Sequence, residues 1–568
     1  MAVLNRVWPV WLTAYRRQWL AGDLSAGVVV TLLLIPQSLA YALLAGLPAQ
    51  AGLYASIVPL LVYALVGRGH AQSVGPMALT SLLTAATLSR FAEAGSSDYL
   101  ALALWLAVLS GVMLLLMGVA RLGFVADFLS EPVLSAFTTA SAVLIVLSQL
   151  GPLAGLHLPG SSLPQWLLGI SQQFSAWQPA ALGLGMLALL LLLALRQWGE
   201  ALLQCLRLSA PTARLLVRAA PVLLMLASLP LSAQWQVPVV GPVDAQWPAV
   251  AMPAISLSRL ADLAIPAFFI ALINYVQSLS VAQLLAARRQ ETVDPDRELL
   301  ALGLCNVAAG LAGGFPVTGG LSRSVVNADA GANTQLASLV TAAGMLLLSC
   351  WGGALLARLP LPVLAAIIIA SLLSMLNVAS LRRAWLAERA DAVAWLLTFG
   401  LVLLLGVDSG IIAGVMVSLT TLLWRSSRPH IAVLGRVPGT HHFRNRERHA
   451  VESLPGVLLL RVDESLYFGN ARQVRQAVLA RHALATGTQQ LVLVMSAVNR
   501  VDTTALSMLA NLDQTLQQAG VSLHLAEIKG PVADILQRTG LSQQFAGRVH
   551  LSTQAAWQAL SRPADYQI

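Results

Sequence analysis

Charged residues are scarce in this sequence. Of its 568 residues, 10% are Asp, Glu, Lys or Arg, whereas 57% are hydrophobic. A soluble protein of this size cannot hide so much apolar surface in its interior. The composition therefore excludes an ordinary soluble globular protein. It indicates a chain whose solvent, over most of its length, is lipid.

Lysine and cysteine are scarce as well. Lys529 is the only lysine, and no glycine-rich phosphate loop with Lys is present, so ATP is not the expected energy source. Cys205, Cys305 and Cys350 are odd in number and lack CxxC spacing, which argues against a disulfide framework or a metal site. Because no hydrolytic or redox constellation appears either, we do not expect an enzyme or a bound cofactor.

The apolar part of the chain contains about fourteen candidate membrane spans, counted as stretches of roughly 20 mostly apolar residues. They begin near Ala26, Gln50, Val74, Tyr99, Glu131, Ala180, Arg218, Ala261, Leu299, Gly319, Thr334, Leu361, Ala392 and Ser409. Two of them are poor helices, namely residues 73–87, which begin around a Gly-Pro pair, and residues 319–331, which are short and polar. Each is the third span of a set of seven, so the sequence predicts two inverted repeats whose broken helices meet near the midplane.

Arginine placement predicts the orientation of these spans. The formal net charge is +9, but the arginines fall in short loops beside apolar spans, where they set topology rather than bind nucleic acid. Residues 151–178 and 219–258 contain no Arg or Lys and follow odd-numbered spans. We therefore expect both termini on the cytoplasmic side of a bacterial inner membrane, and no nucleic-acid partner.

Several motifs along the chain are specific enough to indicate a family. They are PQSLAYALLAGLPAQAGLYASIVP at 36–59, SVGPMALTS at 73–81, RLGFVADFLSEPVLSAFTTASA at 121–142, ELLALGLCNVAAGLAGGFPVTGGLSRS at 298–324 and RPHIAVLGRVPGT at 428–440. Together they resemble the SulP (sulfate permease) family over nearly the whole chain. The resemblance implies a fourteen-span fold shared with nucleobase transporters, a cytoplasmic STAS domain, a homodimer, and elevator-like movement of a core bundle against a scaffold.

The two broken helices give the sequence a candidate anion site. A helix N-terminus offers free N–H groups and about half a positive charge, and two facing N-termini suit a small oxyanion. We place the anion between Gly75, Met77 and Ala78 on one side and Gly320, Leu321 and Ser322 on the other. Gly320 admits close approach of a ligand to the backbone, although a glycine pair can also simply break a helix.

Arg323 is the basic residue of the polar short span. An intramembrane arginine is costly enough to be a functional hypothesis by default. On one interpretation, Arg323 supplies positive potential to the pocket. On the other, it pairs with a structural carboxylate such as Glu131 or with carbonyls. In the resembled family, the Ser-Arg pair matches residues at the anion site.

Three further residues are candidate pocket lining. Gln37 and Tyr41 are four apart and share a helical face, as in the family's PQ-x-x-AY pattern. Gln277 shares a face with Asn274 and Ser278, and many bacterial relatives have a carboxylate at this position. An amide cannot take up a proton at physiological pH, and it has no negative charge with which to hold a sodium ion. Coupling to H⁺ or Na⁺ through another acid, such as Glu131 or Glu298, anion exchange and uncoupled uniport therefore all remain open.

The C-terminal part has a different pattern, in which short β-branched runs alternate with amphipathic helices from Pro455 onward. It resembles a STAS domain, which serves as a regulatory module. We divide the chain into a transport domain at 1–427 (repeats at roughly 20–230 and 255–427), a linker at 428–454 and the STAS domain at 455–568. Asp502 and Thr503 either cap a helix or form a regulatory site for phosphorylation or nucleotide binding.

The function expected from these features is secondary transport of a small inorganic or organic oxyanion, with sulfate as the default. Bicarbonate or dicarboxylate transport, anion exchange and an anion channel on the same fold are the alternatives. Nucleobase transport is less favoured because of the Ser322–Arg323 pair and the STAS-like domain. The expected partners are the anion, the lipid bilayer, a second copy of the chain and a possible regulatory protein on the STAS domain.

Overall fold

The computed structural model describes residues 9–13, 15–128, 130–156, 162–173, 176–243 and 253–561. Both chain termini, whose side of the membrane the arginine pattern predicts, lie outside these residues. The described chain forms two compact units, with unit 1 ending at Ser418 and unit 2 beginning at Leu419.

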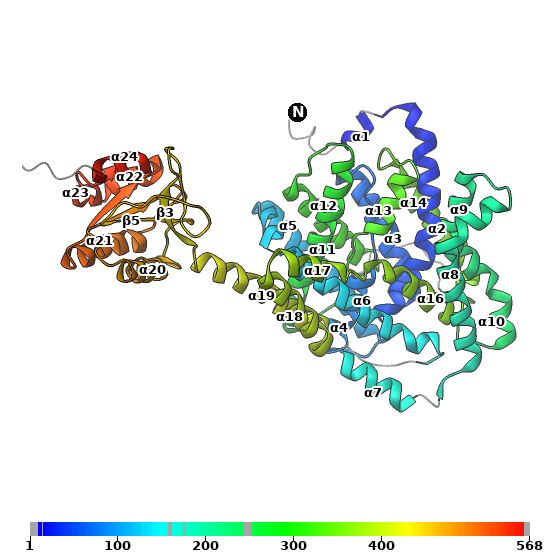
Figure 1. Ribbon diagram of the computed structural model, residues 1–568. Coiled ribbons are helices and arrows are strands. Elements are labelled where there is room, and N and C mark those ends of the chain that lie inside the picture. The colour runs from blue at the N-terminus through cyan, green and yellow to red at the C-terminus, as the bar shows by residue number, and fades with distance from the viewer. Residues whose placement is uncertain are drawn as a thin grey trace, which may run out of the picture. The chain divides into compact units, whose positions relative to one another are not determined.

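Unit 1 is built almost entirely from helices (Figure 1). The first seven that match predicted spans are α2 (Leu20–Leu44), α3 (Ala49–Val66), α4 (Ala78–Leu88), α5 (Ser97–Val119), α6 (Glu131–Leu153), α8 (Pro179–Cys205) and α9 (Ala210–Ala227). The second seven are α11 (Leu257–Arg288), α12 (Pro295–Leu311), α13 (Leu321–Asp329), α14 (Leu336–Trp351), α16 (Leu361–Leu372), α18 (Arg389–Leu405) and α19 (Val407–Ser427). Each predicted start lies in one of these helices or within a few residues before it.

Shorter elements connect them. These are α1 (Val10–Thr13), η2 (Arg17–Trp19), η3 (Gly123–Phe128), α7 (Leu163–Gln173), α10 (Leu229–Trp235), α15 (Gly353–Leu356), η5 (Leu373–Met375) and α17 (Ala379–Ala387). Among the described residues, seven helices are long and apolar enough to cross a bilayer by their own length, the segment Thr212–Trp235 counting as one across α9 and α10. Of the remaining matched helices, α4 and α13 reach only part of the way, with 11 and 9 residues.

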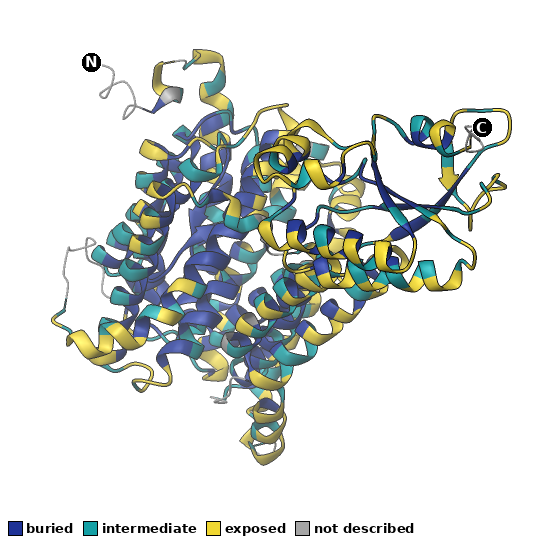
Figure 2. Ribbon diagram, turned by 90° about the vertical axis from the view of Figure 1, so that its left-hand side faces the viewer, coloured by how far each residue is buried: buried dark blue, intermediate teal, exposed yellow. Residues whose placement is uncertain are grey.

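The helices of unit 1 pack in two groups that mix both repeats. In the first, α12 packs on α5 and α3, and α14 packs on α2 and α3. In the second, α16 packs on α8 and α6, and α18 packs on α6. Buried residues fill the interior of unit 1, and exposed residues lie on the outer faces of its helices (Figure 2). Many of the exposed residues are leucines and other large apolar residues. Exposed leucines are the expected outer surface of a bundle that contacts acyl chains.

Unit 2 contains an α/β sheet beyond the end of α19. Its strands are β3 (Ile431–Arg436), β4 (Phe443–Asn445), β5 (Val457–Val462), β6 (Gln490–Val494), β7 (Ser522–Ala526) and β8 (Val549–His550), in the spatial order β4-β3-β5-β6-β7-β8. The strands β5 to β8 are parallel, and β3 is antiparallel to both β4 and β5. Its helices are α20 (Ala471–Leu484), α21 (Thr503–Gln518), α22 (Gly530–Arg538), α23 (Leu541–Gln544) and α24 (Thr553–Ser561).

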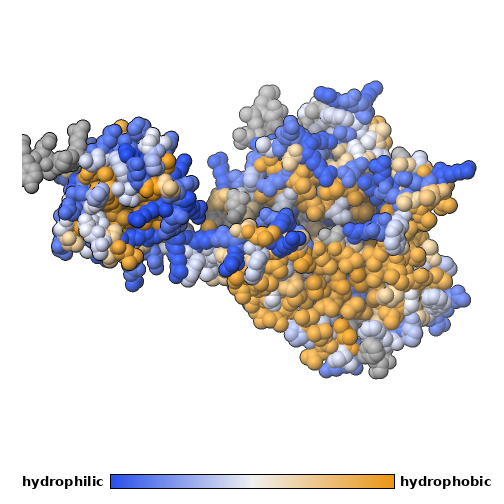
Figure 3. All heavy atoms as spheres, in the orientation of Figure 1, coloured by the Kyte–Doolittle hydropathy of each residue, from blue (hydrophilic) through white to orange (hydrophobic). Residues whose placement is uncertain are grey.

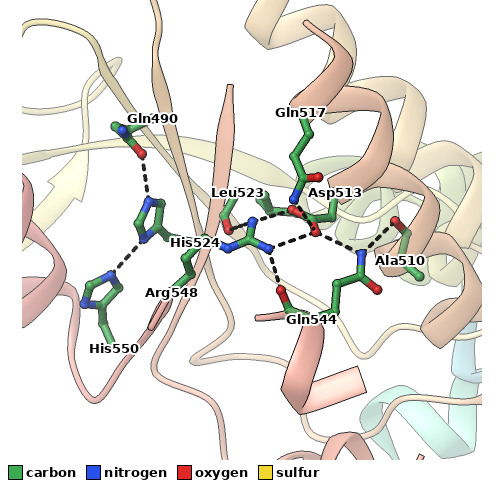
Figure 4. Close-up of polar contacts among 9 residues, drawn as sticks. All are labelled: Gln490, Ala510, Asp513, Gln517, Leu523, His524, Gln544, Arg548 and His550. Atoms are coloured by element: carbon green, nitrogen blue, oxygen red, sulfur yellow. Dashed lines mark hydrogen bonds and ion pairs between the residues drawn. The ribbon is translucent and has the colours of Figure 1, made fainter. Parts of the chain in front are cut away.

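A buried ion pair joins α21 to the segment before β8 (Figure 4). Asp513, which is 0% exposed, accepts from the two terminal nitrogens of Arg548 at 2.5 and 3.0 Å. Gln517 and Gln544 also donate to this carboxylate, and Arg548 donates to the carbonyl of Leu523 at 3.0 Å. The pair is thus fully hydrogen-bonded, as a charge in an apolar core must be.

Candidate functional site

Two very short, buried strands pair with each other inside unit 1, and we call the place where they pair the crossing. The strand β1 (Val74–Gly75) pairs antiparallel with β2 (Thr318–Gly319), so that Val74 lies opposite Gly319 and Gly75 opposite Thr318. The amide of Gly320 continues the pairing by donating to the carbonyl of Ser73 at 3.0 Å. The pairing holds together the two repeats at the point where each enters its broken helix.

Each strand is followed by a helix start. The helix α4 begins at Ala78 with Met77 as its N-cap, and α13 begins at Leu321 with Gly320 as its N-cap. The side chain of Met77 does not bond the first turn of α4, and Gly320 has no side chain that could bond the first turn of α13. The first N–H groups of both helices therefore lack a side-chain cap, and their partial positive charges lie at the crossing.

The guanidinium of Arg323 lies behind the crossing. Its side chain is 2% exposed, and its Nη1 donates to the carbonyl of Pro76 at 2.8 Å. A Cβ added at Gly75 would lie 3.4 Å from Nη1, and one added at Gly320 would lie 2.7 Å from Nε, so the guanidinium packs against the backbone of both glycines. The absence of a side chain at Gly320 is what admits this approach.

Arg323 has no carboxylate partner among the residues that the structure describes, and its Nε and Nη2 are buried there without a hydrogen-bond acceptor. Glu131 does not pair with it, because that residue is exposed in the first turn of α6. Arg323 therefore does not pair with a carboxylate among the described residues. It does bond one backbone carbonyl, that of Pro76. The positive charge at the crossing is therefore not neutralised by an acid of the described chain.

Gln37 and Ser322 line one cavity of about 160 Å³ together with Leu33, Pro36, Arg196, Pro221, Ile367 and Ser371. It lies between α2 and α13 on one side and α8, α9 and α16 on the other. The ring of Tyr41, one turn after Gln37 on α2, is buried. Leu321 is half exposed and Ala78 is buried.

Arg196 was not among the residues singled out from the sequence. It lies on α8, lines the same cavity as Ser322, and donates from Nη1 to the carbonyl of Ala370 at 3.2 Å. The one signal in the sequence is that Arg196 directly follows the apolar run LALLLLLAL at 187–195. This signal places Arg196 at the end of an apolar stretch, but it does not show which helix Arg196 faces.

The polar residues on the face of α11 that was predicted to line the site have two different roles. Asn274 accepts from Thr80 at 2.7 Å, and its backbone carbonyl accepts from the hydroxyl of Thr318 at 2.6 Å, so it ties α4 and β2 to α11. Both amide atoms of Gln277, by contrast, are buried without a partner in the described chain. Gln277 is thus the member of this face whose hydrogen-bonding capacity the protein does not use.

A second polar cluster surrounds Glu298 on the other side of β2. This carboxylate is 4% exposed and accepts from Tyr63 at 3.0 Å, from Gln72 at 2.9 Å and from Ser278 at 2.7 Å. A Cβ added at Gly319 would lie 2.6 Å from Nε2 of Gln72, so the cluster packs directly on the crossing strand. Glu298 forms no ion pair with a described residue.

In unit 2, Asp502 caps α21. Its Oδ1 accepts from the amide of Ala505 at 2.8 Å, and its Oδ2 accepts from the amide of Phe468 at 2.8 Å. Thr503 is exposed beside it. The capping role that Asp and Thr allow at this position is therefore present, and it leaves the hydroxyl of Thr503 open to solvent. Within the described ranges, no three His, Cys, Asp or Glu side chains gather as metal ligands.

Comparison with known proteins identifies matches to both parts of the chain. The Sulfate permease family model matches residues 20–398, and the STAS domain model matches residues 449–556. A probable sulfate transporter of Mycobacterium tuberculosis is 34% identical over 553 residues, which cover 96% of each chain. Human solute carrier family 26 member 6 is 34% identical over 491 residues, covering 83% of this chain and 64% of the human protein.

Solved structures agree on the fold. Murine Slc26a9, described as an anion transporter in the inward-facing state, superposes with a TM-score of 0.88 at 24% identity, covering 99% of this chain and 95% of the murine chain. The transmembrane domain of the cyanobacterial bicarbonate transporter BicA gives a TM-score of 0.59 at 21% identity, covering 72% of this chain and 98% of that domain. The predicted fold class, two inverted seven-helix repeats followed by an α/β domain, is confirmed. The chain therefore belongs to the sulfate permease family of membrane anion transporters, which are not enzymes, and it carries the STAS domain that the sequence motifs predicted.

Proposed function

We propose that this protein is a secondary transporter of small oxyanions, with sulfate as the default substrate, and that the anion binds where α4 and α13 begin. The observation that carries the proposal is the buried guanidinium of Arg323, which has no carboxylate partner in the described chain and lies against both Gly75 and Gly320. A divalent anion at this point gains from two helix N-termini and one full positive charge. The same arrangement opposes a cation.

The remaining contacts of the anion follow from the cavity. Ser322 offers a hydroxyl and Gln37 an amide at its wall. Tyr41 lies one turn after Gln37 on α2, and Met77 and Leu321 lie at the two helix starts. Gln277 contributes an amide whose atoms have no partner in the described protein. Arg196 lies across the cavity on α8, so we assign it to the path by which the anion arrives or leaves.

We infer elevator-like movement for the transport step. The proposed anion contacts, Arg196 apart, come from α2, α4, α11 and α13, whereas the opposite wall of the cavity comes from α8, α9 and α16. Sliding the first group against the second carries the anion across while its contacts to the helix starts stay intact. A homodimer in a bacterial inner membrane, with cytoplasmic termini and a regulatory STAS domain, completes the proposal.

The test is reconstitution of the full chain into liposomes. Uptake of radiolabelled sulfate is measured against competing bicarbonate and fumarate, with and without pH and sodium gradients. Saturable sulfate uptake that is competed by structurally similar oxyanions supports the proposal, and stimulation by sulfate on the opposite side identifies exchange. Flux that follows voltage without saturation indicates a channel instead, and purine or uracil uptake without sulfate uptake refutes the proposal.

Coupling is addressed by a substitution at Gln277. A carboxylate at this position can take up a proton beside the bound anion, which the amide cannot do. We expect Gln277→Glu to introduce a dependence of sulfate uptake on external pH, measured as initial rates in the same liposomes. Glu298→Gln is the companion variant, since Glu298 is a buried acid that packs on the crossing. A flat pH profile in active Gln277→Glu protein would contradict coupling through α11.

A further inference from the structure

A separate cavity of about 620 Å³ lies where α3 and α5 end and α12 begins. Three arginines line it: Arg68 after α3, Arg121 after α5, and Arg297 in the first turn of α12. Because α3 and α5 finish at the same end of the bundle at which α12 starts, these arginines share one membrane face. The cavity is separate from the transport site, and the two have no lining residue in common.

The acidic residues in this cavity are already engaged. Asp294 caps α12 by accepting from the amides of Asp296 and Arg297 at 3.1 and 3.3 Å, and it pairs with Nε of Arg297 at 3.1 Å. Asp296 accepts from the amide of Gly123 at 2.8 Å. Arg68 and Arg121, both exposed, have no carboxylate partner among the described residues. Asp296 keeps its negative charge, so the three arginines of the lining exceed the two aspartates by one positive charge, and Arg68 and Arg121 have no ion-pair partner in the described chain.

The other wall of the cavity is apolar and open. Val66 is 38% exposed, Val119 76% and Leu304 39%. Hydrophilic residues of unit 1 gather at the end where α2 begins, and apolar surface covers much of the remainder (Figure 3). A site with arginines beside exposed aliphatic side chains at a helix end has the polarity profile of the lipid headgroup boundary.

We propose that this cavity binds the phosphate headgroup of an anionic phospholipid such as phosphatidylglycerol. Arg68 and Arg121 donate to the phosphate, and the acyl chains run along Val119 and Leu304. Each arginine near an anionic lipid surface contributes about 1 kcal/mol, so removing both lowers affinity roughly 30-fold. Free inorganic phosphate gains the same two charges but none of the apolar contact, and it binds correspondingly more weakly in water.

The experiment is native mass spectrometry of the full chain in detergent, titrated with phosphatidylglycerol, with phosphatidylcholine, or with phosphatidylglycerol plus excess inorganic phosphate. The variant is Arg68→Gln with Arg121→Gln. Arg207→Gln is a matched control, because Arg207 and Arg121 are both exposed, follow long spanning helices and have positive φ, 68° and 57°. Thermal unfolding of all three proteins checks that the fold is kept.

The expected result is preferential retention of phosphatidylglycerol, lost on the order of 30-fold in the double variant and kept in Arg207→Gln. Equal retention by the double variant and the unchanged protein overturns the proposal. Equal binding of phosphatidylcholine overturns its charge basis, and displacement by inorganic phosphate identifies a free-anion site instead. If the double variant unfolds, Arg121→Gln alone is titrated, with a partial loss expected, and retention equal to that of the unchanged protein overturns the proposal.

Discussion

At the scale of single residues, the proposed anion site depends on polar groups that have no partner among the described residues. Taking a guanidinium out of water costs several kcal/mol unless a partner compensates. Arg323 is compensated by one carbonyl, that of Pro76, and by no described acid. A bound anion is the partner with the right charge for its remaining donors, which is why Arg323 is the first residue to change.

We expect Arg323→Ala to raise the sulfate concentration for half-maximal uptake at least tenfold, since one charge-assisted interaction is worth about 1.5 to 3 kcal/mol. Arg323→Lys keeps the charge without the planar fork, so an intermediate affinity is expected. Initial rates in liposomes measure both, and quantified protein per vesicle corrects for expression. Unchanged affinity in well-folded Arg323→Ala would remove the residue from the site.

A histidine pair in unit 2 provides a pH-dependent feature outside the membrane (Figure 4). His524 on β7 donates from Nε2 to Oε1 of Gln490 at 2.7 Å, so its Nδ1 accepts from Nε2 of His550 at 3.0 Å. Burial, followed by the nearby charges of His550 and Arg548, lowers the pKa of His524 to about 4. The folded domain therefore holds this imidazole neutral.

The sign of the resulting pH dependence follows from the two states. An unfolded histidine titrates near pH 6.5, so between about pH 6.5 and 4 the unfolded chain binds a proton that folded His524 does not. Stability around β7 should fall as pH falls through this window, and His524→Gln should flatten that slope. Hydrogen exchange of the full chain, corrected for intrinsic rates, measures it. The exposed His441→Gln serves as control, and an equal slope in both variants would contradict the assignment.

At the scale of elements, the crossing of β1 and β2 was only partly predictable. The Gly-Pro and Gly-Gly breaks indicate discontinuous helices, and their matching rank indicates that the two meet. The pairing register was not predictable, because two-residue strands have no periodicity to read. Nor did the sequence show that Asn274 and Ser278 are used to hold the crossing while Gln277 beside them is not.

We expect Gly320→Ala to weaken sulfate binding by displacing Arg323. Gly320 has φ of −89°, so alanine causes no backbone strain there, and the effect is a contact of 2.7 Å between the new Cβ and Nε of Arg323. Gly183→Ala on α8 is the control, since nothing lies within 4 Å of a Cβ at that position. Uptake affinity should change in the first variant alone. Equal affinities in both variants would mean that the guanidinium of Arg323 can shift without weakening sulfate binding.

At the scale of the whole molecule, the number and order of spans followed from hydrophobic length and two helix breaks, because lipid leaves a chain few other options. What composition could not supply is how α12 packs on α5, or that Arg196 faces Ser322, since an apolar run is apolar on every side. The transport unit and the STAS unit also have separate buried cores. Destabilising one should therefore leave the other folded.

Arg548→Met tests this separation. Removing Arg548 leaves the buried carboxylate of Asp513 with two neutral amide donors, those of Gln517 and Gln544, and no cation, which costs up to about 3 to 5 kcal/mol. Hydrogen exchange should accelerate in α21 and β7, whereas protection of α11 and α12 should stay the same. Arg538→Met, at an exposed position in the last turn of α22, is the control. Loss of protection in both units would show that they unfold together.

The pairing of β1 with β2 also limits how the gene for such a protein can be divided. Each half of the chain contributes one strand, one helix start and part of both sides of the cavity, but the two halves are not equivalent. The third residue of α13 is Arg323, whereas the third residue of α4 is Thr80, which bonds Asn274. The first half expressed alone has α4 without Arg323, and the second half expressed alone has Arg323 without α4. Two co-expressed halves regain the site only by meeting strand to strand within the bilayer.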